Sequence, residues 1–337
     1  MKTSLVGLLV ALIVVAVATT EATATAPGKN GSIVYRTYFD LQHSRGAIFT
    51  MGDDGSAKKQ ISHPPRGTVD DQPAWAPDGS LVVFTRCAPD LPCHVFAVRP
   101  DGNGTRQLGK PCAAGAHENT CPDDEDASFS PGSRKIVFTQ STGIVRRDTR
   151  GDTWIQHSAL MLMDRNGRNR HLVFRGKAWS GDLHYATFSP DGKRLVFEWD
   201  HSGFVSPPAE KAVFVVDLDG THLRQLTPWN ENSGDGPDWS PDGQWILYHT
   251  HEGDSGPQSQ YFLIHPDGTE RHQLTHFPDG THVASASLSP DGASIVYSKG
   301  PEGGNIDVYT MAADGTNEQR LTQSQLWESA PAWGPKR

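Results

Sequence analysis

The stretch Trp239-Ser240-Pro241-Asp242-Gly243 recurs in variant form along the chain and decides its fold. Each copy closes an apolar segment with a turn of the Pro-Asp-Gly type, and a second turn of the Asp-Gly type follows. The six turn prolines are Pro77, Pro131, Pro190, Pro241, Pro290 and Pro335. They lie about 50 residues apart, and a fixed period of this size is typical of a propeller or solenoid. The repeat overrides the two domains that a length of 337 residues alone would suggest.

Each repeat contains four short segments with the composition of β-strands. In the repeat at residues 73–108, these segments are 73–75, 81–85, 94–98 and 106–108. They are rich in β-branched and aromatic residues, as buried strands are. Asp-Gly turns supply the positive φ angles that match the twist of antiparallel neighbours. A repeated unit of four antiparallel strands is the blade of a β-propeller.

The two ends of the chain complement each other. The N-terminal repeat has strand segments at 33–35, 48–50 and 59–62 but only a poor first strand, whereas the chain ends with a lone first strand at 330–333. Joining these ends would complete a blade and remove exposed sheet edges. The sequence therefore predicts an all-β fold. It is a six-bladed β-propeller of four-stranded antiparallel blades, closed by pairing of the C-terminal strand with the N-terminal blade.

The repeat resembles the TolB-like propeller repeat, a WD40-like family. The shared form is W-S-P-D-G, then V-F, an apolar strand, D-G-T and R-Q-L-T, as at residues 239–243, 219–221 and 224–227. The resemblance covers nearly all of the chain after residue 27. It implies the fold, but such propellers occur as binding modules, as accessory domains of enzymes and as a few enzymes. We expect the propeller alone, without the N-terminal domain of TolB.

The N-terminus has the pattern of a targeting segment. Lys2 precedes an apolar stretch at residues 5–18 that ends in Ala16-Val17-Ala18, a small-x-small cleavage site, and residues 22–26 offer alternative sites. The stretch is too short to span a bilayer comfortably. We expect a signal peptide at 1–18, a flexible segment at 19–30 and the propeller at 31–337. The protein would be secreted, periplasmic or in the cell envelope, with no membrane span after cleavage.

Export makes the four cysteines interpretable. Cys87 and Cys93 are six residues apart, and Cys112 and Cys121 are nine apart. Four cysteines allow three connectivities. We favour local pairing, Cys87 with Cys93 and Cys112 with Cys121, because each pair flanks one loop. A zinc site is the alternative, but the spacings differ from C-x₂-C and an oxidising compartment favours disulfides.

The formal charge of −9 argues against nucleic-acid binding, which needs a basic face. The short, uniform turns all fall on one rim of the predicted disc. The opposite rim carries the longer connections at 140–158, 199–211 and 249–260. Binding residues concentrate on variable loops held by a rigid scaffold. We therefore expect a site on the loop-rich rim, at the mouth of the central channel.

Residues that enter the first strand of each blade should line this mouth. The candidate ligand-binding residues are Asp71, Asp124, Glu125, Asp126, His184, Asp235 and Glu328. A ring of carboxylates could hold a divalent cation such as calcium, a Lys or Arg side chain, or a peptide N-terminus. The alternative interpretation is that these are solvated carboxylates at strand starts. No cofactor is required by the sequence.

Fifteen histidines invite a metal interpretation. His249 and His251 are the best metal candidates because alternate strand residues face one side, and Asp254 is near. A surface-loop role is the alternative. Residues 253–257, Gly-Asp-Ser-Gly-Pro, echo a protease nucleophile loop, but a triad is recognised by geometry and we interpret them as a turn.

The sequence thus favours an exported, non-enzymatic and monomeric propeller. It would bind a protein or peptide, such as a component of the cell envelope, through the loop-rich rim and channel mouth. The alternative is a lyase or hydrolase that acts on a polysaccharide or peptide. That enzyme would use histidines and carboxylates at the channel mouth, with or without a metal.

Overall fold

The structure is a computed structural model and describes residues 28–40, 42–89, 91–109, 112, 121–148, 151–176, 181–201, 211–250 and 259–336. Within these residues the chain forms β-strands and one short 3₁₀ helix at Trp229–Glu231. The prediction of an all-β protein is confirmed. No helix in this described part is long and apolar enough to cross a membrane.

Four sheets share one antiparallel plan of four strands in sequence order. In each sheet the first strand leads into the Pro-Asp-Gly type of turn. The strands are β8 (Asp123–Phe129), β9 (Lys135–Asp148), β10 (Gly151–Asp164) and β11 (His171–Arg175); β12 (Asp182–Phe188), β13 (Arg194–Asp200), β14 (Lys211–Asp217) and β15 (Arg224–Gln225); β16 (Ser233–Trp239), β17 (Ile246–Thr250), β18 (Tyr261–Ile264) and β19 (His272–Gln273); β20 (Thr281–Leu288), β21 (Ser294–Pro301), β22 (Asp307–Ala312) and β23 (Gln319–Arg320).

A fifth sheet has eight strands and consists of two such groups joined at one point. The groups are β24 (Trp327–Pro335) with β1 (Asn30–Tyr38), β2 (Gly46–Met51) and β3 (Lys59–Gln60), and β4 (Val69–Trp75) with β5 (Val82–Ala88), β6 (Leu91–Val98) and β7 (Arg106–Gln107). One parallel pairing, Gly46 with Val69, links them. The C-terminal strand β24 pairs antiparallel with the N-terminal strand β1 from end to end.

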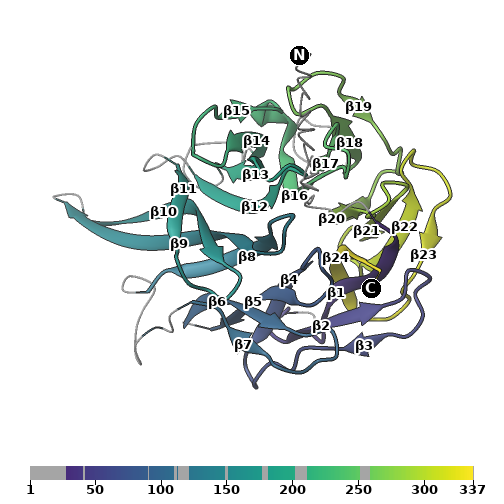
Figure 1. Ribbon diagram of the computed structural model, residues 1–337, viewed down its shortest axis with the longest axis horizontal. Coiled ribbons are helices and arrows are strands. Elements are labelled where there is room, and N and C mark those ends of the chain that lie inside the picture. The colour runs from purple at the N-terminus through teal and green to yellow at the C-terminus, as the bar shows by residue number, and fades with distance from the viewer. Residues whose placement is uncertain are drawn as a thin grey trace, which may run out of the picture.

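The sheets surround a common centre, with the first strand of each group innermost (Figure 1). These inner strands contact one another in a cycle: β4 with β8, β8 with β12, β12 with β16, β16 with β20, β20 with β24, and β24 with β4. The described strands form five separate sheets rather than one closed sheet. Packing of side chains therefore holds most neighbouring groups together.

Apolar side chains fill the spaces between neighbouring sheets. Val137, Phe188 and Phe197 belong to one buried cluster between the β8–β11 and β12–β15 sheets. At the chain ends, Val296 of β21 packs in one cluster with Trp333 of β24. Burial of a side chain of this size contributes roughly 1.5–3 kcal/mol. The hydrophobic core thus consists of separate layers between neighbouring sheets, and the first strands of the groups surround the centre of the molecule.

The repeated turn has a local cause, which the turn at Gly243 illustrates. Asp242 Oδ1 accepts hydrogen bonds from Ser240 Oγ (2.6 Å) and from the backbone N–H of Gln244 (3.0 Å). Gly243 has a φ of 70°, a left-handed conformation that favours glycine. The same serine–aspartate bond recurs at 189–191 and 289–291.

Strands are longer than predicted in two places. β4 begins at Val69, so residues 70–72 lie inside the first strand rather than before it. β9 and β10 continue through the predicted loop at 140–158 and pair as far as Asp148 opposite Gly151. Threonine, isoleucine and tryptophan in this segment favour extended backbone, which the prediction of a loop underestimated.

Candidate functional site at the channel mouth

The inner strands carry β-bulges at corresponding positions. The register with the next strand shifts after Asp71, Glu125, His184, Gly234 and Ala284. Beside these shifts, and in β24, the backbone has a positive φ at Gln72, Asp126, Tyr185, Asp235 and Ala330. A bulge bends its strand and redirects side chains. The repeated bulge therefore gathers side chains from the inner strands at one end of the centre, and this end is the channel mouth.

A central cavity of about 170 Å³ runs between the inner strands. At the mouth it is lined by bulge residues that include Gln72, Asp126 and Tyr185. Further along the strands most of the lining is apolar: Ala127, Ala186, Pro237, Ala286 and Pro331, then Trp75, Phe129, Phe188 and Trp333. Ser128, Thr187, Asp238 and Ser287 also belong to this part of the lining, and Asp238 accepts the backbone N–H of Leu288. The cavity thus has a polar entrance and a mostly apolar wall.

Asp71 anchors one side of the mouth. It forms an ion pair with Arg36 of β1 and accepts a hydrogen bond from Tyr38 Oη (2.7 Å). Arg36 also donates to Ser329 Oγ of β24 (2.6 Å). Burial and the charge of Asp71 raise the pKa of Tyr38, so the phenol stays protonated as a donor. This network ties β4 to the paired chain ends.

Asp126 and His184 form a second cluster, next to Glu125. Asp126 Oδ2 lies 3.2 Å from His184 Nδ1 and 3.2 Å from the backbone nitrogen of Tyr185. Burial opposes the imidazolium, but the hydrogen bond and charge of Asp126 raise the pKa of His184 to about 10. Burial and the charges of Asp126 and Asp123 raise the pKa of Glu125 to about 8. At neutral pH, His184 is a cation and Glu125 is mostly protonated.

Lys211 is the centre of the third cluster. Its Nζ lies 3.2 Å from Glu198 Oε1, 3.0 Å from Asp235 Oδ1 and 3.7 Å from Asp200 Oδ2. The backbone N–H of Asp235 also donates to Glu198. Burial raises the pKa of Glu198, and the three carboxylates raise the pKa of Lys211 against the effect of its burial. A Cβ on Gly234 would lie 2.0 Å from Glu198 Oε2, so this close approach requires glycine.

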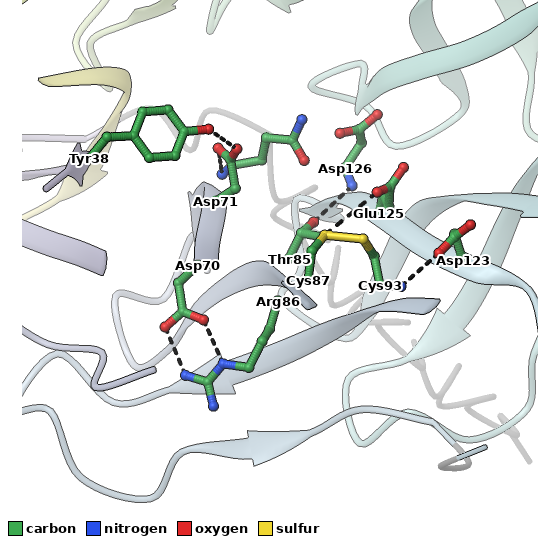
Figure 2. Close-up of a disulfide and its surroundings, with 11 residues drawn as sticks. Tyr38, Asp70, Asp71, Thr85, Arg86, Cys87, Cys93, Asp123, Glu125 and Asp126 are labelled. Atoms are coloured by element: carbon green, nitrogen blue, oxygen red, sulfur yellow. Dashed lines mark hydrogen bonds and ion pairs between the residues drawn. A yellow bond between two sulfur atoms is a disulfide. The ribbon is translucent and has the colours of Figure 1, made fainter. Parts of the chain in front are cut away.

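The structure brings some of the predicted site residues together. Asp71, Glu125, Asp126, His184 and Asp235 lie at or beside the bulges that form the mouth. Figure 2 shows Asp71, Glu125 and Asp126 extending from β4 and β8 near the Cys87–Cys93 disulfide.

Two predicted residues are directed elsewhere. Asp124 pairs with Arg170 (2.5 Å) and accepts a hydrogen bond from Gln140 Nε2 (2.9 Å), within its own sheet. Glu328 is buried on β24. Burial raises the pKa of its carboxyl group overall, although hydrogen bonds with Thr322 and Ser324 partly oppose this effect. Of the seven predicted residues, Asp126 is the one found in the described lining of the cavity, while Asp71, Glu125, His184 and Asp235 lie around its mouth.

Of the two histidines predicted as metal candidates, the structure describes His249 alone. His249 is buried on β17, with its Nε2 3.8 Å from Asp235 Oδ2. His251, Asp254 and the Gly-Asp-Ser-Gly-Pro segment at 253–257 lie outside the described residues. His249 is therefore part of the Lys211 cluster.

Sequence reasoning missed the basic and buried partners of the carboxylates. Arg36 and Lys211 come from the second and third strands of other repeats, and their distance in sequence hides the pairing. Glu198 could have been found from the sequence, because it interrupts the apolar run of β13. In the structure this side chain is fully buried. A charged residue inside such a run is rare unless it is paired.

The predicted local disulfides are confirmed. Cys87 and Cys93 are bonded with a Cα–Cα separation of 4.3 Å, and Cys112 and Cys121 are bonded with a separation of 5.9 Å. Cys87 and Cys93 lie in β5 and β6, and Cys87 Sγ is 3.8 Å from Glu125 Oε1. The bonds use the sulfurs that a zinc site would need as thiolates. The first disulfide fastens the end of a hairpin beside the mouth.

Repeated four-stranded sheets around a cavity lined by their first strands define a protein of the β-propeller class. The chain belongs to the TolB β-propeller domain family, which matches residues 156–337. No curated protein matches the sequence.

Solved structures share the fold at low sequence identity. TolB from Acinetobacter baumannii superposes with a TM-score of 0.66 and 21% identity, covering 91% of this chain and 67% of that one. A nidogen/laminin complex gives 0.62 and 12%, with coverage of 90% and 98%. A puromycin-hydrolysing peptidase of Mycobacterium tuberculosis gives 0.56 and 12%, with coverage of 94% and 50%. These likenesses establish the fold alone.

Proposed function

We propose that the protein is a closed six-bladed propeller that binds a protein or peptide through its loop-rich rim and channel mouth. The blade count rests on dividing the eight-stranded sheet at its single parallel pairing, Gly46 with Val69. The closure rests on the pairing of β24 with β1 and on the cycle of contacts between inner strands.

The central cavity is the observation that carries the binding function. It combines a polar mouth with a mostly apolar wall, and it is lined by inner strands of every group. Apolar pockets with a few convergent polar groups are typical of ligand sites. The bulges and ion pairs hold these polar groups in fixed positions, and a rigid site loses less entropy on binding.

The nature of the partner is also part of this proposal. A protein or peptide of the cell envelope fits an exported monomer, and two disulfides suit an oxidising compartment. Similar folds occur in TolB and in a nidogen/laminin complex. The expected localisation is secreted, periplasmic or envelope-bound.

One observation favours catalysis as a second candidate. Glu125 has a pKa of about 8 and lies beside the Asp126–His184 pair. A carboxyl group that stays protonated near neutral pH can act as a general acid. In that case the mouth would belong to a hydrolase or lyase that acts on a peptide or polysaccharide. A similar fold occurs in the puromycin-hydrolysing peptidase.

A plugged channel tests the binding function. Ser285→Arg places a long side chain in the cavity lining, whereas Thr221→Arg adds the same side chain to an exposed turn on the opposite rim. Each variant and the parent would be used to capture proteins from an envelope extract of the source organism. We expect Ser285→Arg alone to lose the captured partner. Equal recovery by all three would refute binding at the mouth.

The same proteins separate the second candidate from the first. Hydrolysis or elimination by the parent protein, lost in Glu125→Gln while partner capture is retained, would favour the enzyme. Loss of capture in Ser285→Arg without turnover by the parent supports the binding module.

A further inference from the structure

One buried carboxylate oxygen at the mouth has no hydrogen-bond donor among the described residues. Asp126 Oδ2 accepts both the His184 and Tyr185 bonds, while Oδ1 has none. The side chain of Asp126 is only 1% exposed, and the residue lines the central cavity. A buried acceptor left without a donor is costly, so such groups are almost always paired. A donor to Oδ1 of this lining residue is therefore missing among the described residues.

The charge around this oxygen favours a cationic donor. Three basic groups in the described mouth clusters, Arg36, His184 and Lys211, face a larger set of carboxyl groups: Asp71, Glu125, Asp126, Glu198, Asp200 and Asp235. The mouth stays net negative even with Glu125 protonated. Burial and the charges of Asp235, Asp126, Glu198 and Asp71 raise the pKa of Tyr185, in agreement with carboxylates that converge there.

The cavity beyond Asp126 accepts an apolar group of limited size. Its wall there is mostly alanine and proline, interrupted by Asp238 and a few hydroxyl side chains, with Trp75 and Trp333 further along. Its volume of about 170 Å³ is below the roughly 300–1,000 Å³ of pockets for drug-sized ligands. The space suits one side chain rather than a folded segment.

We propose that the mouth binds the free amino terminus of a peptide whose first residue is apolar. The α-ammonium donates to Asp126 Oδ1, the first side chain enters the cavity, and the rest of the peptide leaves over the loop-rich rim. This inference rests on the proposed binding function and names its ligand. A lysine side chain offers the same ammonium chemistry. Entering from the mouth, however, it would carry its charge past Asp126 into the mostly apolar part of the cavity, where the carboxyl group of Asp238 already accepts the backbone N–H of Leu288 and an unpaired charge is costly.

Three synthetic peptides test the ligand on the unmodified protein. The probes are Leu-Ala-Ala-amide, its N-acetylated form, and N-acetyl-Ala-Lys-Ala-amide, with binding followed by ligand-observed saturation-transfer NMR. We expect the free amino terminus to bind and acetylation to weaken binding by about tenfold or more, because a charge-assisted bond is lost. Equal binding of the first two peptides overturns the proposal. Binding of the lysine peptide at least as tight as that of Leu-Ala-Ala-amide overturns the assignment to an amino terminus.

A matched pair of variants tests the residue. Asp126→Asn removes the charge at the mouth, and Asp124→Asn makes the same change on the same strand at a carboxylate that pairs with Arg170 instead. We expect Asp126→Asn to lose about tenfold or more in affinity for Leu-Ala-Ala-amide and Asp124→Asn to keep it. Parental affinity in a folded Asp126→Asn protein overturns the proposal. If none of the peptides binds while Ser285→Arg still loses a captured protein, the ligand assignment fails and the binding function stands.

Discussion

The Nδ1 atom of His184 on β12 lies 3.2 Å from Oδ2 of Asp126 on β8, so one ion pair joins the bulges of two neighbouring sheets. The same oxygen accepts the backbone N–H of Tyr185 in the β12 bulge. The two oxygens of one carboxylate therefore have different roles. Oδ2 fixes the position of one sheet against the next, while Oδ1 is buried without a donor among the described residues.

The His184–Asp126 pair should make stability depend on pH. The pKa of His184 is about 10 in the folded protein and 6.5 in the unfolded chain. The imidazolium therefore stabilises the fold fully below about pH 6.5, and this contribution is lost as the pH rises towards 10. We expect His184→Gln to lower the free energy of unfolding by a few kcal/mol at pH 6, and by much less near pH 10. Chemical denaturation across this range measures both. A deficit that stays constant with pH would contradict the ion pair.

Glu125 should have the opposite energetic effect. Its pKa rises from 4.5 in the unfolded chain to about 8 in the folded protein, so folding favours the protonated form. Stability is therefore lost as the pH rises from about 4.5 to 8. We expect Glu125→Gln to be more stable than the parent above pH 8 and equal to it near pH 4. Thermal unfolding at the two pH values is the measurement. A variant less stable than the parent at pH 9 would show that the carboxylate is stabilised by its surroundings.

How much of this site the sequence predicts depends on how local its causes are. The turn at Gly243 follows from a serine, an aspartate and a glycine within five residues, so the repeat and its strands could be predicted. The local disulfides could be predicted for the same reason. The sequence also placed Asp71 and Asp126 at the start of the first strands of their repeats, and in the structure they lie inside β4 and β8.

The pairing of these carboxylates could not be predicted. Arg36 reaches Asp71 from another strand, and Lys211 reaches Asp235 across a sheet boundary. The bulges are hidden as well, since Tyr185 takes a positive φ of 54° without a glycine to signal it. Most of the acidic ring predicted from the sequence is, in the folded protein, engaged in ion pairs, while Oδ1 of Asp126 and Oε2 of Glu328 are buried without a hydrogen-bond donor among the described residues.

Gly234 tests the Lys211 cluster without removing a charge. A Cβ at this position would overlap Glu198 Oε2, which is fully buried and held by Lys211 and the Asp235 N–H. We expect Gly234→Ala to cost about 1–3 kcal/mol, because the carboxylate must leave its partners. Gly132→Ala is the control, since nothing lies within 4 Å of its added Cβ. Similar free energies of unfolding for the two variants would show that Glu198 moves at no cost.

The pairing of β24 with β1 gives the strongest prediction about the whole fold. Deleting residues 329–337 removes Trp333 from its buried cluster and exposes the edge of β1. We expect a loss of about 5 kcal/mol or more, a large part of the stability of an ordinary domain.

Gly31→Ala tests the same contact with one methyl group, because its Cβ would lie 2.2 Å from the Pro335 carbonyl oxygen. Deleting residues 336–337 is the control. It removes the Lys336–Lys29 backbone bond but leaves β24 in place. Denaturant unfolding should rank the longer deletion as most damaging, Gly31→Ala as intermediate and the short deletion near the parent. Parental stability after loss of 329–337 would mean that β24 does not hold the ends of the chain together.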